Sequence, residues 1–115
     1  DKWSVKELLQ HIIDAERIFT YRALCIARGD TTNLPGFEEN AYAANSNADN
    51  RNWNDLLEEF RAVRHSTLTL FASFNNDQLN ALGTANGKPV YVEGIGFTIA
   101  GHVLHHVKVL KERYL

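Results

Sequence analysis

The strongest constraint on the fold of this chain is a stripe of apolar side chains near its N-terminus, repeated at three- and four-residue steps. The stripe consists of Val5, Leu8, Ile12, Ala15, Phe19, Ala23 and Ile26. Ser4 precedes it and Glu7 follows three residues later, a pair whose side chains can each cap a backbone amide at a helix start. We therefore predict a long amphipathic helix that begins near Val5 and runs until Gly29.

A second helix is predicted at the C-terminus, where three of the five histidines lie in the sequence GHVLHHVKVLKERYL. Its apolar stripe consists of Ile99, Val103, Val107, Leu110 and Tyr114. At about 100° per residue, His102 and His106 fall on the edge of this stripe, whereas His105 falls on the opposite arc. We expect the first two side chains to face the interior and His105 to face solvent.

The inward-facing histidines predict a metal site. Imidazole is the commonest transition-metal ligand among side chains, and residues four apart lie on one face of a helix. His11 lies at the margin of the stripe on the first helix. Together with His102 and His106 it can offer three nitrogens to one divalent ion and leave positions open for water or substrate. The alternative, commoner for an isolated histidine, is a core-edge side chain satisfied by hydrogen bonds.

A third long helix is predicted from helical spacing of apolar residues at Trp53, Leu56, Leu57, Phe60, Val63, Thr67, Leu70, Phe71 and Phe74. His65 lies off this stripe and is expected to be exposed. The connection that precedes the helix, residues 31–52, shows no clear periodicity, and connections of this length are usually lids, binding loops or linkers. Two roles are open for the aromatic residues Phe37, Tyr42 and Trp53. They could line a pocket beside the metal, or they could pack against the end of the bundle and close it.

The segment before the C-terminal helix contains turn signals. Asp77 to Leu82 are expected to form one short turn, and Asn86-Gly87 predicts a tight turn within a small extended excursion. No substantial sheet is expected. Three glycines, Gly94, Gly96 and Gly101, weaken the start of the last helix, and we expect the close approach of another backbone to compensate.

Composition narrows the class of protein. A chain of 115 residues with 44% hydrophobic residues predicts one domain over residues 1–115. Its 12 basic and 14 acidic residues are dispersed, which argues against a nucleic-acid partner, and no apolar run approaches the roughly 20 residues of a membrane span. Cys25 is the only cysteine, so no intrachain disulfide is possible and a reducing cytoplasm is expected. The sequence shows no activating charge beside Cys25, which argues against a catalytic thiol.

Four stretches of the sequence resemble a known family, the DinB-like proteins, which include the YfiT-like metal-dependent proteins. These stretches are WSVKELLQH at residues 3–11, DAER at 14–17, LPGFEENAY at 34–42 and AGHVLHHVKVLKERYL at 100–115. The resemblance implies an all-α, up-down-down-up four-helix bundle with three long helices visible here and a long crossover loop. It also implies one divalent metal, commonly nickel or zinc, held by His11, His102 and His106.

Two departures from the family pattern have consequences. Val103 stands where family members often carry an acidic residue, which removes a possible polar partner near the site. The family bundle also begins with a helix before the WSVKE segment, whereas this sequence starts at Asp1 and contains no methionine. We therefore expect an N-terminally incomplete domain with an apolar groove, and a homodimer that covers this groove.

The resemblance also implies a reaction class, a metal-dependent transferase that joins a low-molecular-weight thiol such as bacillithiol, mycothiol or glutathione to a small-molecule substrate. Two alternatives remain open at this point: a non-enzymatic metal-binding or stress-related dimer, and a metal-dependent hydrolase. Glu16 lies within the apolar arc of its helix, so its carboxylate is expected to need an arginine or a hydrogen bond to a ligand histidine.

Overall fold

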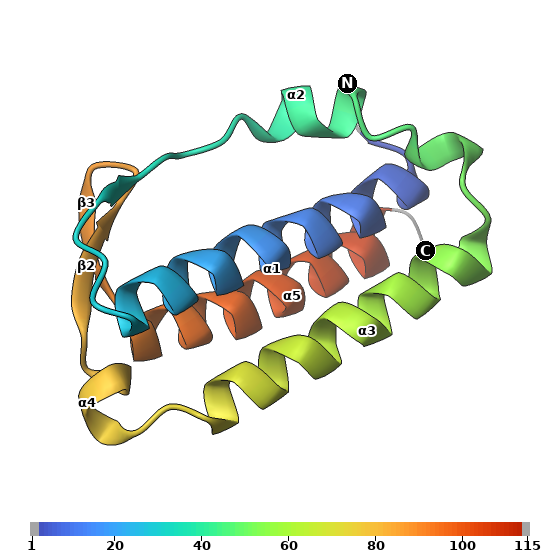
Figure 1. The fold of residues 1–115 in the computed structure, drawn as a ribbon. Helices are drawn as coiled ribbons and strands as arrows, with labels where there is room; N and C mark the ends of the chain where they lie inside the picture. Colours follow the sequence, from blue (N-terminus) through green and yellow to red (C-terminus); the bar gives the residue numbers. More distant parts are fainter. Residues whose placement is uncertain (1–2, 114–115) are drawn as a thin grey trace.

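The computed structural model describes residues 3–113, and three long helices dominate it (Figure 1). They are α1 at Val5–Ala27, α3 at Trp53–Ala72 and α5 at Val92–Arg113. Figure 1 shows α1 and α3 running in the same direction and α5 running in the opposite one, and α1 packs against both of the others. These are the directions of the last three helices of an up-down-down-up bundle, so the predicted all-α fold is confirmed. Tyr114, which the predicted stripe includes, lies outside the described residues.

The ends of α1 follow from its sequence. The hydroxyl of Ser4 accepts a hydrogen bond from the amide of Glu7 at 3.1 Å, and the Glu7 carboxylate accepts one from the amide of Ser4 at 2.9 Å. This reciprocal cap is the predicted one. The helix ends at Ala27 because Gly29 adopts a φ of +85°, a left-handed conformation that glycine tolerates without steric cost.

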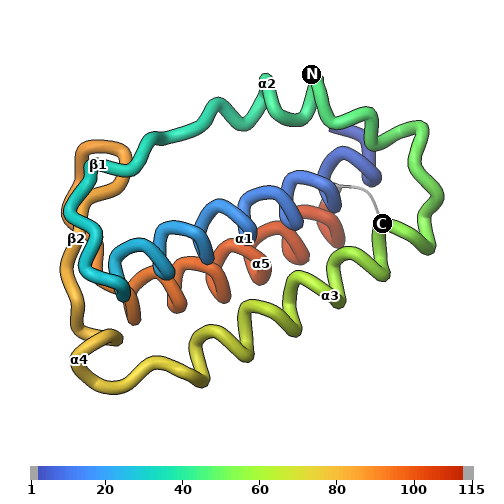
Figure 2. Tube along the Cα trace, viewed as in Figure 1, coloured from blue at the N-terminus to red at the C-terminus, as the bar shows by residue number. Residues whose placement is uncertain are grey.

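The connection between α1 and α3 returns along the bundle as a crossover segment, residues 31–52 (Figure 2). It contains the short strand β1 at Asn33–Leu34, the helix α2 at Glu39–Ala44 and the 3-10 helix η1 at Ala48–Asn50. The connection without clear periodicity thus contains short regular elements. Helix α2 has only six residues, which is too short to show a helical period in the sequence. The Glu38 side chain caps its start by accepting a hydrogen bond from the amide of Asn40.

A small sheet covers one end of the bundle. After α4 at Asn76–Leu79, strands β2 at Leu82–Ala85 and β3 at Lys88–Tyr91 pair as an antiparallel hairpin. Asn86 and Gly87 form its turn with φ values of 53° and 74°, which confirms the predicted tight turn. Strand β1 adds to β2 in parallel, with Asn33 opposite Thr84, a pairing that the sequence analysis did not predict.

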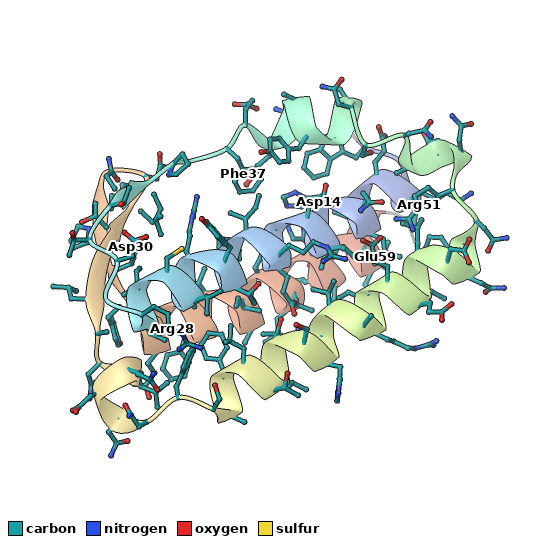
Figure 3. All side chains as sticks on the ribbon, in the orientation of Figure 1. Asp14, Arg28, Asp30, Phe37, Arg51 and Glu59 are labelled. Atoms are coloured by element: carbon teal, nitrogen blue, oxygen red, sulfur yellow. The ribbon has the colours of Figure 1, made fainter. Side chains whose placement is uncertain are left out.

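Polar side chains fasten the other end of the crossover segment to α1 and α3. Arg51 donates a hydrogen bond to the side chain of Gln10 at 2.7 Å and pairs with Glu59. The amide of Gln10 in turn donates to Asp14 at 3.0 Å. Figure 3 shows Asp14, Arg51 and Glu59 gathered at this end of the bundle. The crossover segment is thus held at η1 by charges and at β1 by backbone pairing.

Two groups of buried side chains form the core. The larger one lies beneath the sheet and consists of Ala23, Ile26, Leu34, Phe74, Ala85, Val92, Ile95 and Ile99; the smaller one consists of Ile13, Leu56 and Val63. The prediction that another backbone approaches the glycines of α5 was wrong. A side chain at Gly96 would lie 2.9 Å from the ring of Phe71, and one at Gly94 would lie 2.8 Å from the ring of Tyr91. At Gly101 no atom of the described residues would lie within 4 Å of an added side chain. No helix in the described part of the chain combines the length and apolarity needed to cross a bilayer.

Candidate metal centre

Three histidine rings from two helices meet between α1 and α5. The Nε2 atom of His102 lies 3.1 Å from Nε2 of His11 and 3.0 Å from Nε2 of His106. One ligand nitrogen from each ring lies within 4.8 Å of the other two. The structure therefore brings together the three residues that the sequence singled out. His105 and His65 are exposed, as predicted.

Hydrogen bonding alone does not account for this convergence. A ring nitrogen of a neutral imidazole is either a donor with one hydrogen or an acceptor with one lone pair. Nε2 of His102 therefore cannot make two full hydrogen bonds, one to each of the other rings. A shared cation satisfies all three lone pairs at once, and three imidazole nitrogens are a usual donor set for a divalent metal. The residues present thus fit a metal ion.

The electrostatics keep these three rings uncharged. Burial, and secondarily the ring of His106, lowers the pKa of His11 to about 4. The pKa values of His102 and His106 are also lowered to about 4, in each case by burial first and by neighbouring histidines second. At neutral pH all three rings are therefore uncharged, which is the protonation state that metal binding requires.

Aromatic rings enclose the cluster on two sides. The ring of Trp3 lies 4.7 Å from that of His11, and the ring of Phe19 meets His102 edge-on at 5.7 Å. The sequence analysis did not assign either residue to the site. Phe19 lies eight residues after His11, two helical turns along α1 and close to its face, and this spacing was the available signal.

The acidic candidates lie elsewhere. Glu16 is 2% exposed, with Oε1 at 3.5 Å from the Arg64 guanidinium and Oε2 accepting from the Thr67 hydroxyl at 2.6 Å. The predicted arginine partner is confirmed, and the alternative of a hydrogen bond to a ligand histidine is wrong.

Nδ1 of His106 is buried and has no hydrogen-bond partner among the described residues. A valine at position 103 is consistent with this lack of a polar neighbour.

The aromatic residues of the crossover segment do not line the histidine cluster. Phe37 and Tyr42 pack against each other at 5.1 Å and border a separate cavity on α1. Trp53, in contrast, lines an apolar groove that His106 also borders. Cys25 packs against the larger core group, at the sheet end of α1.

Comparison with known families agrees with this geometry. A family model for the DinB superfamily matches residues 1–110. This chain belongs to the DinB superfamily. Neither the curated proteins nor the solved structures that were compared include a match. Members of the DinB superfamily often bind metals, and the three histidines of this DinB protein form a cluster that could hold a metal ion.

Proposed function

We propose that this DinB protein binds one divalent ion through Nε2 of His11, His102 and His106, and that it is a transferase using a low-molecular-weight thiol. The observation that carries the proposal is the convergence of three uncharged ring nitrogens on one point. Nickel and zinc are the ions we expect, because imidazole suits both. Three protein ligands leave at least one position for an exogenous group.

The residues around the cluster have separable roles in this proposal. The histidines hold the ion, while the rings of Trp3 and Phe19 limit the access of water to it. The ion would supply Lewis acidity that lowers the pKa of a bound small thiol, so that its thiolate is present near neutral pH. Cys25 is partly buried, packs against the core group beneath the sheet and lies 14 positions after His11 on α1, so we expect the thiol to come from outside the chain. Such thiols are abundant in the reducing cytoplasm, where we place the protein.

A thiol-addition experiment tests the reaction class. Nickel-loaded protein is mixed with bacillithiol, mycothiol or glutathione, and its absorption spectrum and the conjugation of 1-chloro-2,4-dinitrobenzene are followed. We expect one thiol to change the nickel spectrum and to be conjugated faster than without protein. The His105→Ala variant should behave like the wild type, and the His102→Ala variant should not.

Two outcomes would contradict the transferase proposal. Nickel-loaded protein that leaves its spectrum and the conjugation rate unchanged with every thiol would favour a binding protein. Turnover of an ester such as 4-nitrophenyl acetate without any thiol, abolished in the His102→Ala variant, would favour a hydrolase.

We also propose a homodimer, because α5 carries apolar side chains on two faces. Ile95 and Ile99 are buried in the core, yet on other sides of the helix Phe97 is 69% exposed and Leu104 is 70% exposed. An apolar groove of about 170 Å³ also lies between α1, α3 and α5, with Val103 and Val107 of α5 in its wall. His106 forms part of its wall, so a helix from a second copy would also cover one side of the histidine cluster.

Sedimentation equilibrium of the wild type and of the Leu104→Lys variant tests the dimer. We expect the wild type to dimerise at micromolar concentration and the variant to dimerise at least about tenfold more weakly, the loss expected when one buried leucine is replaced. Leu82→Lys is the matched control, because Leu82 is 71% exposed on strand β2. A monomeric wild type, or equal weakening by both substitutions, would contradict the proposed interface.

A further inference from the structure

A second cavity lies between α1 and the crossover segment. It has a volume of about 250 Å³, and its walls include Ile18, Tyr21 and Arg22 of α1 together with Pro35, Phe37 and Tyr42 of the crossover segment. None of the three clustered histidines lines it. At a rise of about 1.5 Å per residue, Arg22 lies roughly 16 Å along α1 from His11. The cavity is therefore separate from the candidate metal centre.

Arg22 brings an unbalanced positive charge to this cavity. Its Nη2 donates to the backbone carbonyl of Pro35 at 2.9 Å, but its Nε is buried and has no hydrogen-bond partner in residues 3–113. Within the same residues no carboxylate lies at ion-pair distance from it. A partly buried cation without a counter-ion costs free energy, and an anionic ligand recovers some of it.

The guanidinium is also held in a fixed position. In addition to the bond to Pro35, it lies 5.8 Å from the centroid of the Phe19 ring. The chain before Pro35 is itself anchored to the hairpin, because Leu34 pairs with Ala85 and its carbonyl accepts a hydrogen bond from the amide of Asn86 at 2.8 Å. The positive end of the cavity is thus formed before any ligand binds, which reduces the entropic cost of binding.

The rest of the cavity wall is mostly apolar and includes three aromatic rings. The rings of Phe37 and Tyr42 lie 5.1 Å apart at an interplanar angle of 58°, and Tyr21 is 60% exposed beside them. A mostly apolar cavity with one oriented charged group is the usual arrangement for a small organic ligand. These walls favour a planar apolar body over a bare inorganic anion, which would leave the aromatic faces without contact.

We propose that this cavity binds a small aromatic carboxylate, whose ring packs between Tyr21 and the Phe37–Tyr42 pair and whose carboxylate pairs with the Arg22 guanidinium. The site does not depend on the histidine cluster or on the transferase activity, since the two share no lining residue. Arginine suits this role because its planar guanidinium can donate two parallel hydrogen bonds to a carboxylate.

NMR titration of the metal-free protein with benzoate and with benzamide tests this site. The two probes have nearly the same shape, but only benzoate is charged. We expect benzoate to shift the backbone amide signals of residues that line the cavity, and to bind at least about tenfold more tightly than benzamide, as expected for a charge-assisted hydrogen bond. The Arg22→Gln variant should bind the two probes equally, and Arg22→Lys should keep part of the preference.

Arg17→Gln is the matched control, because Arg17 also borders the cavity but is 58% exposed and pairs with Glu59 at 3.0 Å. It should bind benzoate as the wild type does. If Arg22→Gln does not fold, the proposal is still tested by three other results. These are the preference of the wild type for benzoate over benzamide, the location of the residues whose signals shift, and the preference of the Arg22→Lys variant. Equal affinity for the two probes, shifts confined to other surfaces, or equal losses in the Arg17 and Arg22 variants would overturn the proposal. Because no metal is present, none of these results bears on the transferase.

Discussion

Replacing His102 with alanine is expected to lower the affinity of the protein for zinc or nickel by at least about a hundredfold. Even a residue that only supports a metal ligand typically contributes ten- to a hundredfold, and Nε2 of His102 is the atom that lies near both other rings. Competition with a chromophoric chelator, on protein purified without a nickel column, measures the change. Elemental analysis of the wild type should give about one ion per chain.

The His105→Ala variant is the control for this experiment. His105 neighbours His106 in the same helix, with ring centroids 5.2 Å apart, but its side chain is exposed. Its removal should leave the metal affinity unchanged. A wild-type protein that fails to take up added zinc or nickel would disprove the site, and so would an equal loss in the His105→Ala variant.

Replacing Arg64 with alanine is expected to lower the free energy of unfolding by about 3 kcal/mol, because it leaves the carboxylate of Glu16 buried without a counter-ion. Glu16 is 2% exposed, whereas the Arg64 side chain is 31% exposed. Because Arg64 is partly exposed, the expected loss in the free energy of unfolding lies at the low end of the range for breaking a buried ion pair. Urea unfolding monitored by circular dichroism measures the change.

Two further variants make the Arg64 result specific. Arg17→Ala removes an arginine that is 58% exposed from its ion pair with Glu59, and should cost less than about 1 kcal/mol. Adding Glu16→Gln to Arg64→Ala should restore part of the stability, because an uncharged amide needs no counter-ion. If the Arg17 and Arg64 variants are equally stable, the carboxylate of Glu16 does not depend on Arg64.

The long helices could be predicted because their signals are local. The cap formed by Ser4 and Glu7 and the apolar period of α1 involve residues within a few turns of one another, and both appear in the structure. Helical geometry also placed His102 and His106 on one face. It could not say which face of α1 meets α5, so it offered His11 only as a candidate third ligand, and the resemblance to the family implied the same residue.

The features that the sequence did not reveal depend on contacts between distant residues. Strand β1 has only two residues and pairs with Thr84 and Ala85 some fifty positions later, so no pattern within it predicts a strand. The crossover segment has no period that fixes its path. Consequently the sequence could not show that Phe37 and Tyr42 line the cavity beside Arg22 and not the histidine cluster. Nor could it predict the contact between the ring of Phe71 and Gly96.

The histidine cluster joins the two ends of the chain. His11 and His102 are 91 positions apart, and nearly every element of the fold lies between them in the sequence. An ion bound to both would act as a non-covalent cross-link that closes this loop, and long loops gain the most from closure because open chains have the most conformational freedom to lose. Release of the ion and fraying of the terminal helices would then be thermodynamically linked.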